Sequence, residues 1–285
     1  MSVALTYFDS VYFYEDDDKL SFPSFVFAEP VMEEIYIIDS KGRIVIYTSD
    51  LYPLYSFGKN IGIQSPQGLT VDAEGNLYVT QAETQDIPRP RISVFNACMK
   101  WVRDIYIEGF EGADSFIPYR LTLDKKGHIY VAGTYFPGVV VLDDKGKFTD
   151  MISPEEEGRK VKVNNVAMDK AGKIYLVSEE AGKVYVYNEN KKLLFKFGEK
   201  GGSTGKLSRP RAVGIDNRNG RLYVVDYMRH TISAYDGEGA YLFEFGGMGW
   251  SEGWFQYPND IFIDKDGKIF VADMFNNRVQ VFNAW

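Results

Sequence analysis

The fold is decided by the stretch Pro66-Gln67-Gly68-Leu69-Thr70-Val71-Asp72, which turns at Gly75 into Leu77-Tyr78-Val79. It consists of a proline, an alternating apolar segment, an aspartate, a glycine turn and a second apolar segment that contains a tyrosine. A period of two is typical of a β-strand with one buried face. The Asp-x-x-Gly step suits a tight turn, because glycine adopts a positive φ without a steric penalty. The stretch is therefore predicted to form a β-hairpin.

The same hairpin returns at a nearly constant spacing. Further copies begin at Pro118, Val163, Pro210 and Pro258, and a degenerate first copy runs from Pro23 to Glu29. The aspartates at the bends of the five clear copies are separated by 52, 45, 47 and 48 residues; they are Asp72, Asp124, Asp169, Asp216 and Asp264. A period in the forties with four strands per unit, termed a to d in chain order, is typical of propeller blades. Six such units predict an all-β, six-bladed β-propeller with four-stranded antiparallel blades.

The two ends of the chain are predicted to complete one blade together. The last unit reaches its third strand at 278–282 and ends at Trp285 without a fourth. Residues 3–8 form a strand segment that no unit claims, so we expect them to close the last blade and remove an exposed edge. The prediction is one domain over 1–285, with blades at about 20–58, 65–107, 117–152, 162–198, 209–247 and 257–285.

Composition and charge exclude several classes of protein. The formal net charge is −8, from 40 acidic and 32 basic residues, so a protein that grips nucleic-acid backbone is disfavoured. The single Cys98 cannot form an internal disulfide or a thiolate zinc cluster. No apolar segment approaches the roughly 20 residues that span a bilayer, and Met1 to Asp18 lacks the parts of an intact signal peptide.

The last two units resemble the NHL repeat family. The resemblance is carried by Phe197-Gly198-x-x-Gly201 with Gly205-x-Leu207-x-x-Pro210, and by Phe245-Gly246-Gly247-x-Gly249 with Gly253-x-Phe255-x-x-Pro258. It extends over nearly the whole chain and is weakest in the first unit. It implies the same six-bladed fold but says little about function, because NHL propellers serve in protein binding, RNA binding and catalysis. Stand-alone bacterial NHL proteins are often exported, so the resemblance favours the cell envelope without fixing the compartment.

The resemblance also implies which face of the disc carries function. It places the d-to-a and b-to-c connections together around the channel, on what we call the long-loop face. Polar residues that follow the repeat proline are expected at the mouth of the channel there. They are Gln67, Tyr119, Arg120, Asn164, Asn165, Arg211, Asn259 and Asp260. These groups could contact a ligand, or they could only satisfy loop backbone and channel water.

Three connections on the same face hold candidate partner-binding residues. Trp250 and Trp254 lie in the connection 248–255, and tryptophan is a preferred interface anchor. Arg89 and Arg91 belong to a proline-rich insertion, and Tyr135 lies at the corresponding place in the next unit. The alternatives are that Phe255 and also Trp254 pack between blades and that the other two loops are merely solvated.

Catalytic and metal sites are poorly supported. His128 and His230 are the only histidines and are expected on opposite faces, which is too few for a three-histidine zinc site; His230 is expected to support a turn. No GxSxG elbow is present. A thin resemblance to gluconolactonase-like and paraoxonase-like propellers would imply channel calcium on oxygen ligands, to which Asn164, Asn165, Asn259 and Asp260 could contribute. No cofactor is expected, and calcium stays open as an alternative.

The sequence thus favours a non-enzymatic module that docks a protein or peptide on the long-loop face. A hydrolase or lyase with an oxygen-ligated metal in the channel is one alternative. An RNA-binding propeller is another, which the acidic charge disfavours. The acidic run Glu15-Asp16-Asp17-Asp18 is read as solvated or as a contact for a basic partner.

Overall fold

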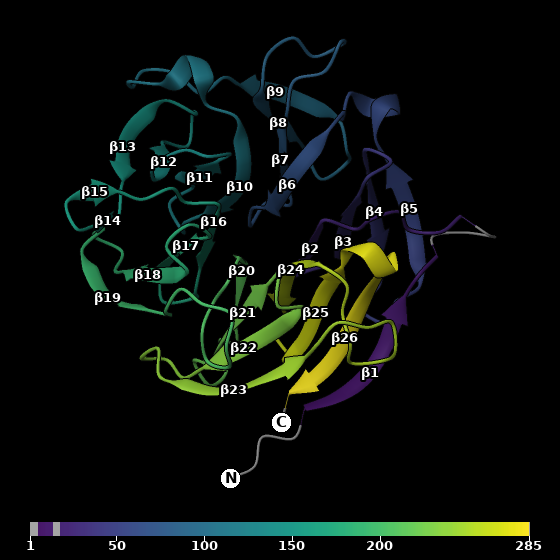
Figure 1. Ribbon diagram of the computed structural model, residues 1–285. Helices are drawn as coiled ribbons and strands as arrows, with labels where there is room; N and C mark the ends of the chain where they lie inside the picture. The colour runs from purple at the N-terminus through teal and green to yellow at the C-terminus, as the bar shows by residue number, and fades with distance from the viewer. Residues whose placement is uncertain (1–4, 14–17, 285) are drawn as a thin grey trace.

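Six four-stranded antiparallel sheets form a ring around a central axis (Figure 1). Within each sheet the strands follow one another from the centre of the ring to its outer edge. The computed structural model describes residues 5–13 and 18–284. The predicted all-β, six-bladed β-propeller is confirmed.

The blades follow one another in chain order. Blade 1 comprises β2 (Phe25–Ala28), β3 (Ile35–Asp39), β4 (Arg43–Tyr47) and β5 (Pro53–Phe57), and blade 2 comprises β6 (Pro66–Val71), β7 (Leu77–Gln81), β8 (Arg91–Phe95) and β9 (Trp101–Ile105). Blade 3 comprises β10 (Pro118–Leu123), β11 (Ile129–Gly133), β12 (Val139–Leu142) and β13 (Phe148–Ile152), and blade 4 comprises β16 (Asn165–Met168), β17 (Ile174–Ser178), β18 (Lys183–Tyr187) and β19 (Leu193–Phe197). Blade 5 comprises β20 (Pro210–Ile215), β21 (Leu222–Asp226), β22 (Thr231–Tyr235) and β23 (Tyr241–Gly246). Blade 6 comprises β24 (Pro258–Ile263), β25 (Lys268–Asp273), β26 (Arg278–Ala284) and β1 (Leu5–Val11).

Blade 6 is closed by the two ends of the chain, as predicted. Strand β1 pairs with β26 from Leu5 opposite Ala284 to Val11 opposite Val279, with one register shift after Tyr7. The closing strand therefore extends beyond the predicted end at residue 8, and β26 extends beyond residue 282. Residues 3 and 4 of the predicted strand lie outside the described residues, as do residues 15–17 of the acidic run.

Burial falls from the inner strands to the outer strand of each blade. Strand β17 is buried along its whole length, whereas most of the outermost β19 is exposed. The inner strands are buried on both faces because each sheet packs against the blades on either side. The cores therefore lie between blades, as in the cluster that joins Ala212 and Tyr223 of blade 5 to Ile261 and Phe282 of blade 6.

The aspartate at each a-to-b bend has a structural role. In Asp264, Oδ1 accepts hydrogen bonds from the backbone N–H of Asp266 and Lys268, at 2.9 and 2.8 Å. In the degenerate first copy, Glu29 replaces the bend aspartate, and its carboxylate accepts hydrogen bonds from the N–H groups of Val31 and Met32. His128 lies at one of these turns, with Nδ1 2.7 Å from its bend aspartate. The hairpin pattern is thus explained by turn chemistry.

The remaining elements are short. A two-stranded ribbon, β14 (Glu155–Glu156) with β15 (Arg159–Lys160), follows blade 3. Three single-turn 3₁₀ helices are η1 (Lys59–Ile61), η2 (Ala113–Ser115) and η3 (Met274–Asn276). Within the described residues, no helix has the length and apolar character needed to cross a bilayer.

Candidate functional site

The connection from β23 to β24 presents two tryptophans on the long-loop face. Trp250 is 75% exposed and Trp254 is 50% exposed. The alternative for this loop was that Phe255 and Trp254 pack between blades. Phe255 is fully buried between blades, whereas Trp254 is not. The Trp254 ring instead covers Gly247, where a Cβ atom would lie 2.7 Å from the ring.

Buried hydrogen bonds from strand β26 hold the backbone of this connection in place. The guanidinium of Arg278 donates to the carbonyl oxygens of Ser251 and Trp254, both at 2.9 Å, and to the carboxylate of Asp273 at 2.8 Å. Gln280 donates to the Trp254 carbonyl at 2.7 Å and accepts from the Gly253 N–H at 2.9 Å. The tryptophans are therefore exposed on a backbone that is already ordered.

A row of aromatic rings in edge-to-face and tilted contact lies beside this connection and spans three blades. Ring centroids are separated by 5.3 Å from Phe22 to Phe275, 4.9 Å from Phe275 to Tyr257 and 4.9 Å from Tyr257 to Tyr227. The guanidinium of Arg211 lies 4.8 Å from the Tyr227 ring at one end. We call Phe22, Phe275, Tyr257 and Tyr227 the aromatic row. Its rings are half-buried to exposed, so their free edges remain accessible.

Two equivalent residues hold the row in place. His230 Nδ1 accepts a hydrogen bond from the Tyr257 N–H at 3.0 Å, and Asn277 Oδ1 accepts from the Phe22 N–H at 2.8 Å. Phe22 and Tyr257 both have positive φ, of 44° and 51°, and so does Ser65, which also precedes a repeat proline. His230 is buried, and its ring supports the connection before β24 rather than the b-to-c turn for which its role was predicted.

Sequence reasoning missed the aromatic row because its members come from blades 1, 5 and 6. A signal was present in the repeat frame. Phe22 and Tyr257 each precede a repeat proline, and Tyr227 and Phe275 each lie in the b-to-c turn of their unit. Comparing equivalent positions in the six units, rather than reading along the chain, would have identified these four aromatic residues as one group.

The eight residues predicted at the channel mouth fall into two sets. The residues directly after the repeat proline, or after Val163 in blade 4, lie toward the long-loop face and are mostly half-buried. Most of them bond to backbone, as Asn164 does when it donates to the Arg211 carbonyl at 3.0 Å. This set is Gln67, Tyr119, Asn164, Arg211 and Asn259. In blades 3 and 6 the next residue lies beyond a register shift that follows the repeat proline. Arg120, Asn165 and Asp260 are buried and line the channel cavity, which the residues before them do not.

The other predicted residues lie elsewhere on the disc. Arg89 pairs with Glu108 and stacks over the Tyr106 ring at 4.8 Å, and Arg91 lies 3.4 Å from Asp104. Tyr135 is 79% exposed. These residues belong to blades 2 and 3, across the ring from the connection between blades 5 and 6 (Figure 1). The structure does not bring them together with Trp250.

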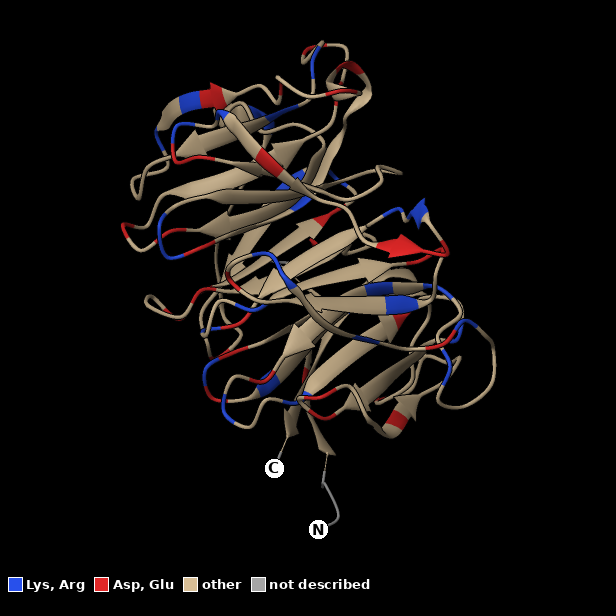
Figure 2. Cartoon of the chain, turned by 90° about the vertical axis from the view of Figure 1, so that its left-hand side faces the viewer, with Lys and Arg blue, Asp and Glu red and all other residues tan. Residues whose placement is uncertain are grey.

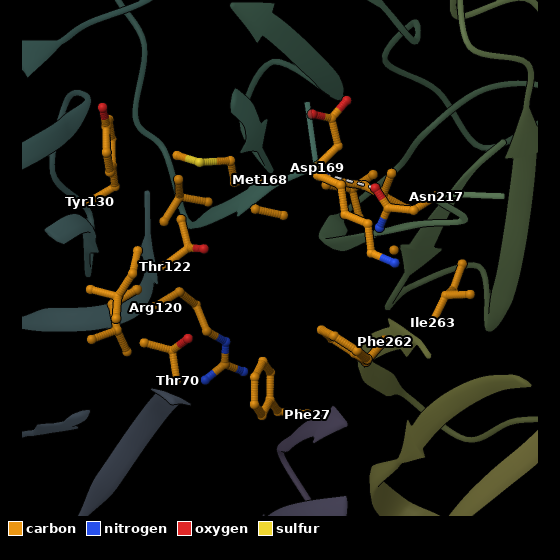
Figure 3. A pocket seen from close by; sticks show the side chains of 18 of the residues that line it. Phe27, Thr70, Arg120, Thr122, Tyr130, Met168, Asp169, Asn217, Phe262 and Ile263 are labelled. Atoms are coloured by element: carbon orange, nitrogen blue, oxygen red, sulfur yellow. Dashed lines mark hydrogen bonds between the residues drawn. The ribbon is translucent and has the colours of Figure 1, made fainter. Parts of the chain in front are cut away.

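The central channel encloses a cavity of about 520 Å³, which opens on the face opposite the long loops. We call this the hairpin face, since the a-to-b and c-to-d turns lie there. The six innermost strands form the wall, and Lys125, Asp169, Asn190, Asn217 and Lys265 lie at the rim. Figure 3 shows Arg120, Thr70 and Phe27 around the cavity.

Arg120 and Asp260 form a charged layer at the closed end of this cavity. Arg120 donates to the Ser24 carbonyl at 2.7 Å and to the Gln67 carbonyl, and Asn259 shares the Ser24 oxygen at 2.7 Å. Asp260 accepts from the Val26 N–H at 3.1 Å. Burial raises the pKa of Asp260 to about 6, against the opposing charge of Arg120. The layer links blades 1, 2, 3 and 6 across the axis.

The raised pKa predicts an unusual dependence of stability on pH. Because the folded protein holds the Asp260 proton up to about pH 6 and the unfolded chain only to about 3.8, this group favours folding at low pH. The favourable contribution, on the order of 3 kcal/mol, is lost as pH rises through 6. Urea unfolding of wild type and Asp260→Asn from pH 4 to pH 7 is expected to show wild type losing stability relative to the variant. Parallel curves would contradict the prediction.

The four residues predicted as calcium ligands supply little negative charge. Asp260 is the one carboxylate among them, and Arg120 places a positive charge in the same layer. The amide oxygen of Asn164 already accepts a hydrogen bond from the Glu179 N–H at 2.8 Å. In the part of the chain that is described, no three His, Cys, Asp or Glu residues gather as a metal site.

Comparison with known proteins supports the fold. The family model for the NHL repeat matches residues 255–282. An auxiliary nutrient binding protein from Bacteroides ovatus is similar, with 14% identity, a TM-score of 0.73 and coverage of 99% of this chain and 76% of that one. Virginiamycin B lyase from Staphylococcus aureus has 14% identity, a TM-score of 0.62 and 99% coverage of both chains. The Cps50 (Swd1) β-propeller domain of Myceliophteria thermophila has 8% identity, a TM-score of 0.67 and coverage of 98% and 99%. No curated protein matches in sequence.

Proposed function

Because the chain is a six-bladed β-propeller that carries an NHL repeat, we propose that it is a non-enzymatic interaction module whose long-loop face binds a protein or peptide. The observation that carries the proposal is the aromatic row, which extends over blades 5, 6 and 1 on the same face as Trp250; the Trp250 connection meets the turn that holds Phe275, where Asn276 donates to the Gly249 carbonyl at 2.9 Å. Aromatic residues and arginine are enriched in protein interfaces, and tryptophan and tyrosine dominate their hot spots.

The geometry of this surface reduces the entropic cost of binding. The Trp250 connection is held by Arg278 and Gln280, and the row is held by His230 and Asn277. A preorganised surface loses little conformational freedom when a partner docks. The polar border includes Arg209 and Arg211, which both pair with Glu179. This combination of a rigid aromatic centre and a charged border fits a protein partner.

Catalysis and nucleic-acid binding have less support. The likeness to the lyase, at 14% identity, concerns the fold alone. The metal-dependent alternative has no cluster of three His, Cys, Asp or Glu side chains among the described residues to support it. Basic and acidic residues are mixed along the side of the disc shown in Figure 2, without the continuous basic stripe that phosphate binding favours.

Replacing Trp250 with serine is expected to abolish capture of the partner. The wild-type protein and the variant would be immobilised and exposed to extract from the source cells, and bound proteins would be compared by quantitative mass spectrometry. Loss of a hot-spot tryptophan typically costs at least 2 kcal/mol, which is a decrease in affinity of about 30-fold. Folding stability should change by less than about 0.5 kcal/mol, since the side chain is exposed.

Trp101→Ser is the matched control for this experiment. Trp101 is 60% exposed on the outer strand β9, away from the aromatic row. The proposal requires a protein that is captured by wild type and by the Trp101 variant but not by the Trp250 variant. Equal capture by all three would contradict it.

A further inference from the structure

The channel cavity is separate from the long-loop face. Its wall contains no residue of the d-to-a or b-to-c connections, within the described part of the chain, and it opens among the hairpin turns. A volume of about 520 Å³ lies in the range of small-molecule sites in proteins. The proposed docking of a protein partner leaves this cavity unused.

The middle of the cavity combines apolar and hydroxyl-bearing side chains. Phe27 and Phe262 meet edge to face, with ring centroids 5.0 Å apart. Thr70 and Thr122 lie in the equivalent position of their strands and line the same space (Figure 3). A ligand here would contact aromatic carbon on one side and hydroxyl groups, which both donate and accept, on another.

The closed end of the cavity carries two buried charged groups. Arg120 is only 3% exposed, and its terminal nitrogens donate to the Ser24 and Gln67 carbonyls, so its charge is held at this end of the cavity. Asp260 lies in the same layer and offers an acceptor.

The charges around the cavity favour a neutral ligand. An anion at Arg120 would bring a second negative charge next to Asp260, and a cation at Asp260 would approach Arg120. The rim is mixed as well, because Lys125, Lys170 and Lys265 each follow a bend aspartate in the sequence. Neither sign of ligand charge is compensated by the site as a whole.

We propose that this cavity binds a neutral polyhydroxylated molecule of mono- or disaccharide size, which enters from the hairpin face. A hydroxyl group at the closed end can donate to the Asp260 carboxylate. Other hydroxyls reach Thr70 and Thr122, and the C–H face of the sugar ring packs on Phe27 and Phe262. The site is independent of the protein partner proposed above.

The test is isothermal titration of the purified full chain with a panel of neutral mono- and disaccharides that includes D-glucose and maltose. D-glucuronate and D-glucosamine serve as charged probes of the same size. At least one neutral sugar is expected to bind, and the charged probes are expected to bind at least about tenfold more weakly than that sugar. Thr122→Val keeps the shape of the side chain, removes the hydroxyl and should weaken binding of that sugar about fivefold.

Thr149→Val is the matched control, since Thr149 lies on the outer strand β13 and donates to the Val141 carbonyl. It should bind sugar like the wild type, as should Trp250→Ser. Three outcomes would overturn the proposal: no neutral sugar binds at up to about 10 mM, a charged probe binds more tightly than every neutral one, or the Thr122 variant is unaffected.

Discussion

Replacing Arg278 with methionine is expected to lower the free energy of unfolding by about 3–5 kcal/mol. Arg278 is 2% exposed and donates to the Asp273 carboxylate, the Tyr12 hydroxyl and two carbonyls of the Trp250 connection. Without it, Asp273 remains as a buried carboxylate whose charge is no longer compensated, and both carbonyls lose a charged donor. Equilibrium unfolding in urea measures the loss.

The variant should also release the Trp250 connection from the body of blade 6. The matched control is Arg103→Met, because Arg103 lies near the surface of blade 2 and donates to the Lys145 carbonyl at 3.2 Å. That substitution should cost less than about 1 kcal/mol. Similar losses in both variants would show that the Arg278 network does not have the stabilising role inferred from its contacts.

Deletion of residues 1–11 is expected to have an effect at least as large. The deletion removes β1, exposes the edge of β26 and takes the buried Val11 from the cluster that includes Val279 and Val281. Each buried apolar side chain contributes about 1.5–3 kcal/mol, so the loss of Val11, Leu5 and Tyr7 amounts to roughly 5 kcal/mol. That is a large share of the stability of an ordinary domain.

Size-exclusion chromatography and thermal unfolding would report the effect of the deletion. The truncated chain should unfold at a lower temperature and associate through its open edge. A synthetic peptide of residues 1–13 should restore much of the stability when it is added in trans, which separates strand closure from damage elsewhere. A truncated chain that stays monomeric and unfolds at the wild-type temperature would contradict the assigned closure.

The fold could be predicted from the sequence because each blade repeats one local pattern. The bend at Asp264 and the strand after it depend on neighbours within about ten residues, so alternation and turn chemistry suffice. Ring closure followed from counting strands at the two ends. The equivalence of His230 to Asn277 could also be predicted, although both side chains support the residue before a repeat proline and not their own turn.

The proposed surfaces could be predicted only in part. Trp250 was singled out because one loop concentrates tryptophan, but the aromatic row depends on contacts between blades that no local pattern records. Arg120 and Asp260 were expected at the channel mouth, whereas they lie at the closed end of a cavity, beyond a register shift that the repeat pattern does not reveal. That the cavity opens on the hairpin face depends on how six strands pack around one axis, which the repeat alone does not specify.

Site-specific photo-crosslinking in the source cells tests the central claim most directly. A photoreactive phenylalanine analogue would replace Trp250 or Phe275 on the long-loop face, Leu193 on the outer strand β19, or Lys126 on the hairpin face. The account predicts one protein adduct of the same mass at positions 250 and 275 and none at 193 or 126. An adduct confined to position 193 or 126, or no adduct at 250 and 275, would contradict the account.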